Sequence, residues 1–230
     1  MSPNLELQDL SIGLLPVFLV LFLMWRSDQD IKKASVALLR MFIQLLIVGY
    51  FLLVIFAQPS PLASLMLLVI MMVAASYLAL NVQCSITLST FRTALISIVV
   101  GGGTVLFITT QAVLHIDPWY NPRYLIPLAG MIFAGSMTAI SLALERFQAE
   151  LSRENVNKAK DIAFKAAMIP VVNSLLAVGV VSLPGMMTGQ ILSGVEPYIA
   201  ARYQIMVMCM IFSSTGLTVF LFLKLHCRQK

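Results

Sequence analysis

Residues 41–91 contain no Asp, Glu, Lys, Arg or His, and this uncharged run restricts the possible folds more than any other feature. A membrane-spanning helix needs roughly 20 mostly apolar residues. The run is long enough for two such helices, divided at the turn residues Gln-Pro-Ser-Pro of positions 58–61. Only 11% of the 230 residues are charged, against about a quarter in soluble domains. The sequence therefore predicts an all-α, polytopic membrane helix bundle in which residues 1–230 form a single transmembrane domain.

Seven spans are predicted, at residues 7–25, 38–57, 62–81, 93–114, 124–144, 164–182 and 202–223. The loops between them alternate in charge, because all but two of the 15 Lys and Arg residues fall on one side. The two exceptions are Arg123 and Arg202. Basic residues are retained on the cytoplasmic side, so we expect an outside N-terminus and a cytoplasmic C-terminus. This integral, multi-pass protein would lie in the plasma membrane, the inner one in a bacterium, and its net charge of +5 gives no reason to expect nucleic-acid binding.

Two segments on the predicted cytoplasmic side have the character of surface helices. Residues 26–40 predict an amphipathic elbow helix in the membrane interface, or alternatively the cytoplasmic end of the second span. Residues 145–165 predict a charged helical hairpin with a turn near 152–157. This hairpin is either a docking site for a soluble partner or a solvated hairpin without one. The basic residues proposed for partner contact are Arg146, Arg153, Lys158 and Lys160.

Residues 166–195 form an uncharged run that Pro184, Gly185, Gly189 and Gly194 interrupt. Non-helical backbone at membrane depth survives only inside protein or beside a water-filled cavity, so such a break indicates a transport path. The alternative is an ordinary turn between two spans. Polar side chains and thioethers would line the path, or would serve only in helix packing. The residues assigned to the path are Gln44, Asn173, Pro184, Gly185, Met186, Met187, Gly189 and Gln190, and the transported species stays open.

Several kinds of chemistry are missing from the sequence. Residues 101–104, Gly-Gly-Gly-Thr, lack the Lys of a P-loop and are better explained by close helix packing. No Ser/His/Asp arrangement or H-E-x-x-H motif occurs, so no enzyme activity is expected. The centres of the spans carry no Asp, Glu or His for a proton relay. His115 and Asp117 of the outer loop could bind a cation, although such residues are more often solvated loop groups; metal ligands remain unassigned.

Residues 183–194, Leu-Pro-Gly-Met-Met-Thr-Gly-Gln-Ile-Leu-Ser-Gly, resemble the signature of the FetB-type permeases, the UPF0014 family. Residues 40–50, 122–132 and 169–174 agree with the same family in the same order. The family includes bacterial permeases assigned to iron export and plant aluminium-tolerance proteins. The resemblance implies one half of an ABC-type exporter, expected to act as a homodimer that moves metal, with iron the expected cargo. A separate cytoplasmic ATP-binding cassette ATPase would bind the ATP, and this chain would bind no cofactor.

The sequence departs from the family pattern between the fifth and sixth spans. Family members carry a longer cytoplasmic segment there, with a Leu-Gly-Ala turn, whereas residues 150–165 of this chain lead almost directly into the sixth span. A non-transporting membrane sensor or scaffold that recruits a cytoplasmic partner is therefore the rival interpretation. A carrier without an ATPase is the second alternative, which the lack of carboxylates inside the spans disfavours.

Overall fold

The computed structural model describes residues 12–27, 29–81 and 86–227. These residues are helical, and no β-strand occurs among them apart from an isolated bridge between Val178 and Ser182. The chain divides into two compact units at the Gln58–Pro59 bond. The predicted all-α class is confirmed.

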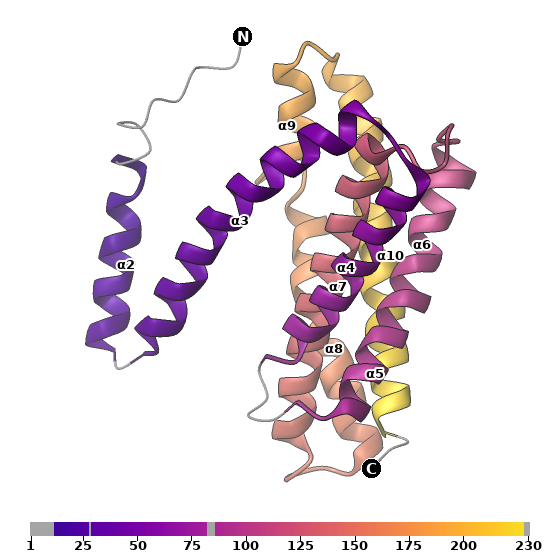
Figure 1. Cartoon of the computed structure of the whole chain (residues 1–230). Helices are drawn as coiled ribbons and strands as arrows, with labels where there is room; N and C mark the ends of the chain where they lie inside the picture. Colours follow the sequence, from indigo (N-terminus) through magenta and orange to yellow (C-terminus); the bar gives the residue numbers. More distant parts are fainter. Residues whose placement is uncertain (1–11, 28, 82–85, 228–230) are drawn as a thin grey trace. The chain divides into compact units, whose positions relative to one another are not determined.

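The first unit contains α2 (Leu15–Arg26) and α3 (Ile31–Ala57). Asp30 caps the start of α3, because its side chain accepts a hydrogen bond from the backbone N–H of Lys33 at 3.1 Å. From there α3 continues without interruption through residue 40 (Figure 1). Residues 31–40 of the predicted elbow are therefore the first turns of a long helix. Residues 1–11, which include the start of the first predicted span, lie outside the described part.

The second unit is a helix bundle in which prolines open several of the helices. Pro61 and Pro122 stand at the first positions of their helices, where a missing N–H costs no intrahelical hydrogen bond. The bundle consists of α4 (Pro61–Ala79), α5 (Leu88–Ser97), η1 (Ile98–Gly102), α6 (Gly103–Phe107), η2 (Ile108–Val113), α7 (Pro122–Glu150), α8 (Val156–Ala177), α9 (Gly185–Leu192) and α10 (Pro197–Cys227). Residues 88–113 form one span in which the π-helical segments η1 and η2 alternate with α-helix.

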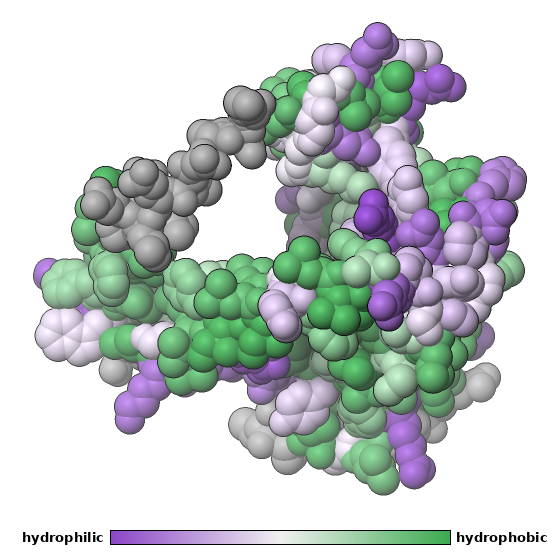
Figure 2. Space-filling view, turned by 45° about the horizontal axis from the view of Figure 1, so that its top comes forward, coloured by the Kyte–Doolittle hydropathy of each residue, from purple (hydrophilic) through white to green (hydrophobic). Residues whose placement is uncertain are grey.

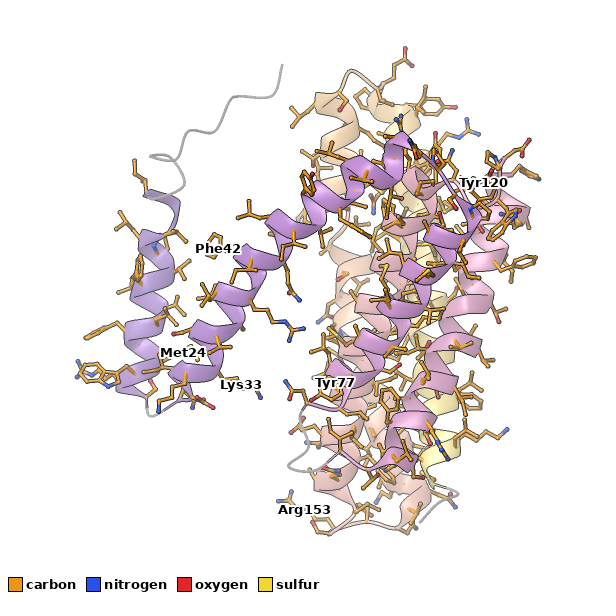
Figure 3. The ribbon with its side chains drawn as sticks, in the orientation of Figure 1. Met24, Lys33, Phe42, Tyr77, Tyr120 and Arg153 are labelled. Carbon is orange, nitrogen blue, oxygen red and sulfur yellow. The ribbon has the colours of Figure 1, made fainter. Side chains whose placement is uncertain are left out.

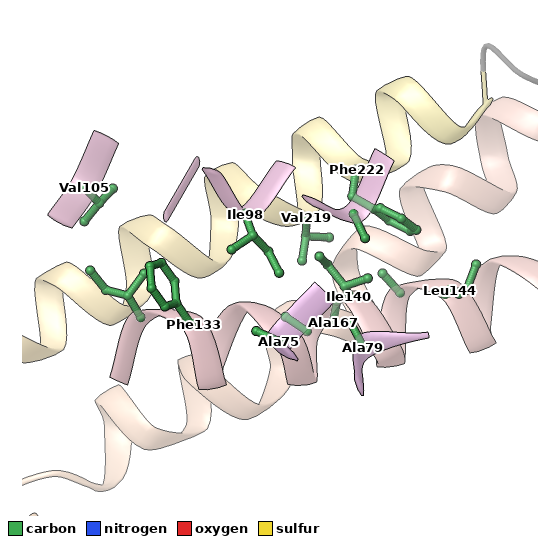
Figure 4. Packing of buried hydrophobic residues seen from close by; sticks show 14 of the residues in the cluster. Ala75, Ala79, Ile98, Val105, Phe133, Ile140, Leu144, Ala167, Val219 and Phe222 are labelled. Atoms are coloured by element: carbon green, nitrogen blue, oxygen red, sulfur yellow. The ribbon is translucent and has the colours of Figure 1, made fainter. Parts of the chain in front are cut away.

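The core of this unit is built from small, branched and aromatic side chains on α4, α5, η1, α6, α7, α8 and α10 (Figure 4). Ala79, Ala94, Ala143 and Ala163 are fully buried, which allows the helices to approach closely. The closest approach is at Gly101 of η1, where an added Cβ would lie 2.9 Å from the Cα of Thr218 on α10. The expectation of close helix packing is thus confirmed for Gly101 and Gly102, whereas a Cβ added at Gly103 would meet no atom within 4 Å.

Two hydrogen bonds fix α4 and α7 in parallel. The Ser64 hydroxyl donates to the carbonyl of Tyr120 at 2.8 Å, and the Ser141 hydroxyl donates to the carbonyl of Ala79 at 2.8 Å. Tyr120 lies at one end of the bundle, and Arg153 lies at the other (Figure 3). The charged α7–α8 turn and the C-terminal end of α10 share the Arg153 end (Figure 1). The bundle therefore has one strongly basic end, while its orientation in the membrane stays a prediction.

Within the described part of the chain, five helical segments are long and apolar enough to cross a membrane, namely α3, α4, residues 88–113, α7 and α10. The apolar helix α2 has 12 described residues, and α8 carries charged residues in its first turns. Hydrophobic side chains cover much of the visible surface (Figure 2). The molecule is thus an integral, multi-pass membrane helix bundle, and the total of seven spans stays a prediction.

A candidate binding groove along α8, α9 and α10

The predicted break in the uncharged run is a short helix held between two turns. α8 ends at Ala177, α9 occupies Gly185–Leu192, and α10 begins at Pro197. Gly179 has φ +85° in the first turn, and Gly194 has φ +93° in the second. This left-handed region is accessible to glycine at little cost. The chain can therefore change direction twice within a few residues of α9.

Two side-chain hydroxyls, one at each end of α9, donate hydrogen bonds to backbone carbonyls of the same segment. Pro184 caps the helix, and its carbonyl accepts a hydrogen bond from the Thr188 hydroxyl at 3.1 Å. The Ser193 hydroxyl donates to the carbonyl of Gly189 at 2.8 Å. A Cβ added at Gly185 or Gly189 would meet no atom within 4 Å. The two glycines therefore leave open space beside α9, and they are not needed for close packing inside the described part of this chain.

A cavity of about 340 Å³, which we call the α9 cavity, lies where α9 packs on α10. Its lining is mostly apolar, with sulfur atoms from α9 and α10 and one amide side chain. The lining residues are Leu175, Val178, Gly179, Leu183, Met187, Ala201, Gln204, Ile205, Met208 and Cys209. A volume of this size is within the range of small-ligand sites in proteins.

A second cavity of about 380 Å³, the α7 cavity, lies between α7, α8 and α10. It is lined by Ala134, Gly135, Thr138, Ala139, Leu142, Ala167, Pro170, Val171, Ser174, Met208, Ile211 and Thr215. Met208 lines both cavities, so the two adjoin along α10. Gln204, Met208, Ile211 and Thr215 recur at helical spacing on one face of α10. We call the two adjoining cavities the α10 groove.

Two oxygen atoms on this face of α10 are buried and unsatisfied. Gln204 is 6% exposed and Thr215 is 3% exposed. Gln204 Oε1 and Thr215 Oγ1 have no hydrogen-bond partner among the described residues, and the same is true of Gln190 Oε1 on α9. Each such group costs about 1–3 kcal/mol when it stays unpaired. The three oxygen atoms are closed off from solvent, so an occupant of the groove would remove this cost only by a rotation of the side chain that turns its oxygen toward the groove.

The groove is uncharged. None of the described residues that line either cavity is Asp, Glu, Lys, Arg or His. The described part of the chain also contains no group of three His, Cys, Asp or Glu residues that could hold a metal ion. The groove therefore offers neutral oxygen and sulfur atoms as ligands, which bind weakly enough for an occupant to leave again.

The residues assigned to the path from the sequence lie in different surroundings. Met187 lines the α9 cavity, and Met186, its neighbour on α9, packs against the hydrophobic core. Gln190 buries its Oε1 atom, whereas Asn173 is exposed on α8 and lines neither cavity. Gln44 is exposed on α3 of the first unit.

Gln204, Met208 and Thr215 are not among the residues that the sequence predicted for the path. A signal was present, because Gln204 is the one amide side chain in the uncharged run of residues 203–223 and the other two follow it at helical spacing. This signal is weaker than that of the proline and glycines in the break, because polar residues also occur in helices that only pack together.

The predicted partner-contact residues gather at the α7–α8 turn. Arg146 pairs with Glu150 at 2.7 Å, and Lys158 pairs with Glu154 at 2.8 Å. The Lys160 ammonium lies 5.7 Å from the centre of the Phe220 ring. Arg153 stands in the turn itself, between the end of α7 and Asn155, the residue that caps α8 (Figure 3).

The loop at the opposite end holds a separate small cavity of about 260 Å³. His115 and Asp117 line it together with Tyr124. The two residues that the sequence suggested as a cation site thus line one cavity. They do not form part of a group of three His, Cys, Asp or Glu residues, and the described part of the chain contains no such group.

Comparisons with known proteins identify relatives over nearly the whole chain. The model of the uncharacterised protein family UPF0014 matches residues 7–159 and 152–230, two ranges that overlap in the α7–α8 turn. UPF0014 membrane protein slr1647 of Synechocystis is 36% identical over 197 residues, 78% of this chain and 75% of that protein. UPF0014 membrane protein YjkA of Bacillus subtilis is 31% identical over 230 residues, 91% of this chain and 89% of that protein.

A third relative has a more specific name. The probable iron export permease protein FetB of Escherichia coli is 32% identical over 236 aligned residues, 94% of this chain and 89% of that protein. No solved structure matches the chain.

Proposed function

The chain belongs to UPF0014, a family of membrane proteins, and from this premise we propose that it is the permease subunit of an ABC-type exporter. It moves a metal ion out of the cytoplasm, with iron as the first cargo to test. A separate cytoplasmic ATPase binds and hydrolyses the ATP, and two copies of the permease work together. The name of the Escherichia coli relative, a probable iron export permease, supports this choice of cargo.

The observation that carries the proposal is the α10 groove. Its two buried, unpartnered oxygen atoms are 11 positions apart on α10, which corresponds to about 16 Å along the helix axis. The two residues that carry them line adjoining cavities that share Met208. Conduction requires sites that attract the ion and yet release it. A row of neutral ligands along one helix meets both requirements, and the turns that flank α9 give the protein a segment that can change conformation.

The exporter proposal is tested by iron efflux from cells loaded with radioactive iron. Gln204→Leu and Thr215→Val each remove one unpartnered oxygen of the groove at nearly constant volume, and each is expected to slow efflux. Met210→Leu is the matched control, because Met210 is 3% exposed, belongs to the core and lines neither cavity. Efflux at the wild-type rate in both groove variants, with equal amounts of protein in the membrane, would contradict the proposal.

A second candidate function is a sensor or scaffold that recruits a cytoplasmic partner without transport. The overlap of the two family matches at residues 152–159 favours it, because the segment expected to contact the ATPase is shortened there. Purification of the full chain from its own membranes separates the two functions. A nucleotide-binding subunit in stoichiometric amount supports the exporter, and a different stoichiometric partner without ATPase activity supports the scaffold.

A further inference from the structure

Three sulfur-containing side chains and one buried amide side chain line the α9 cavity. Met187 comes from α9, and Met208 and Cys209 come from α10. Gln204, on the same cavity, is 6% exposed, and its Oε1 atom has no partner among the described residues. Because the residues come from two helices joined by a glycine-containing turn, the cavity can adjust to what it binds.

Methionine usually fills gaps in a hydrophobic core, and this chain also uses it in that way. Met186 and Met210, which are neighbours of the cavity residues on the same two helices, pack into the core. Met187 and Met208 differ from them because they line the α9 cavity, which has a volume of about 340 Å³. Packing in the core therefore accounts for Met186 and Met210 but not for Met187 and Met208.

The charge of the cavity restricts the cation that it could hold. None of its described lining residues is a carboxylate or an imidazole, the ligands that hold most divalent and trivalent metal ions in proteins. Moving an ion out of water without an opposite charge is costly, and the cost rises steeply with the ionic charge. A cation that suits this cavity is monovalent and prefers sulfur to water. Thioether and thiolate ligands select Cu(I) by this preference, and Ag(I) has the same chemistry.

We propose that the α9 cavity binds a soft monovalent metal cation, Cu(I) or Ag(I). The thioethers of Met187 and Met208 are its ligands, the amide oxygen of Gln204 completes the site, and Cys209 supplies a further sulfur atom beside it. This inference rests on the proposed function only in treating the cavity as part of the transport path. It adds a second class of cargo to iron.

The test is Ag(I) binding to the purified full-length chain in detergent, measured by equilibrium dialysis with radioactive silver. The double variant Met187→Leu, Met208→Leu nearly conserves side-chain volume and removes both thioethers of the cavity. Its affinity for Ag(I) is expected to fall by about tenfold or more, which corresponds to about 1.4 kcal/mol. The matched control, Met137→Leu with Met210→Leu, removes two thioethers that pack in or against the core and is expected to bind as the wild type does.

Equal Ag(I) affinity in the cavity variant and the wild type would overturn the inference, and so would an equal loss in the control. Circular dichroism on each variant establishes that the helices are intact, and Gln204→Leu provides an independent second variant that should also weaken binding. The assay contains neither ATPase nor iron. Failure to bind silver would therefore contradict this inference but not the exporter proposal. Silver binding by a chain that has no ATPase partner would support this inference while the exporter proposal fails.

Discussion

At the residue scale, Gln204 combines two properties that rarely occur together. It is buried on the inner face of α10, and its amide oxygen has no partner among the described residues. A residue kept only for packing would be replaced by leucine without loss, since exchange of an unpaired polar group for an apolar one of similar shape is neutral or stabilising. The presence of an amide side chain at this position is therefore more easily explained by function than by stability.

Gln204→Leu should stabilise the protein while it impairs transport. Removal of the unpaired oxygen is expected to raise the free energy of unfolding by about 1 kcal/mol, which thermal unfolding in detergent would detect as a higher Tm. A lower Tm would indicate that Gln204 makes a structural hydrogen bond, and a functional role would then lose its support. Met210→Leu serves as the control for volume changes on α10.

The glycines of the chain differ sharply in what surrounds them. Gly101→Ala would place a Cβ 2.9 Å from the Cα of Thr218, a backbone atom that cannot move aside easily. We expect a loss of about 1–3 kcal/mol in stability, as for other overpacked cores. Gly185→Ala enters open space and should change stability by about 0.5 kcal/mol or less. Parallel thermal unfolding curves would test this contrast, and equal Tm shifts for the two variants would contradict it.

At the element scale, α9 has an inner face that contributes to the groove and an outer face that contacts nothing in the described part of the chain. Gly185 and Gly189 stand four positions apart on the helix, so they lie on one face. In the proposed exporter this face either moves with the transport cycle or meets the second copy of the permease. Both roles need small side chains at these positions, although the fold of the monomer does not.

The double variant Gly185→Leu, Gly189→Leu should therefore abolish efflux while membrane insertion and stability persist. Efflux assays paired with quantification of the protein in isolated membranes would measure both. Gly103→Leu is the control, because Gly103 is also a helical glycine with no atom within 4 Å of its added Cβ. Normal efflux in the double variant would exclude α9 from the path.

The basic residues of the α7–α8 hairpin differ in whether they form an ion pair within the hairpin. Arg146 and Lys158 are each held in an ion pair with a glutamate one turn away, and Arg153 occupies the turn. Arg153→Glu should reduce co-purification of the ATPase, because it reverses the charge at the tip of the predicted docking surface. Exchange of Glu154 and Lys158, which conserves the pair, should leave co-purification unchanged. An unaltered yield of ATPase with Arg153→Glu would move the docking site elsewhere.

Uncharged runs of the sequence predicted α3, α4, α7 and α10 well, since burial in lipid leaves little alternative to a helix. The sequence predicted a span over residues 164–182 and a break after it, whereas α8 ends already at Ala177. It could not predict that a short helix would form between two turns in the break. That outcome depends on packing against α10. Gln204 and Thr215 were not predicted as site residues for a similar reason. A polar residue in a regular helix points to a site only when the structure shows that it is buried and has no hydrogen-bond partner.

At the scale of the whole molecule, the distribution of charge and the direction of the helices together predict how the bundle is oriented in the membrane. In the second unit, Arg153 and the C-terminal end of α10 lie at one end of the bundle, opposite Tyr120 (Figure 3). Basic residues are retained in the cytoplasm. Export from the cytoplasm therefore requires the Arg153 end to face the ATPase and the Tyr120 end to face outward.

Single cysteines in a background without Cys84, Cys209 and Cys227 would test this orientation. Tyr120→Cys should react with a membrane-impermeant maleimide in intact cells, whereas Arg153→Cys should react only after the cells are permeabilised. Both positions lie in or beside polar turns, so both should react once all sides are accessible, and this provides the internal control. The opposite pattern would place the basic end outside, where a cytoplasmic ATPase could not reach it. The exporter proposal would then fail together with the predicted topology, whereas silver binding in the α9 cavity would be unaffected because it does not depend on orientation.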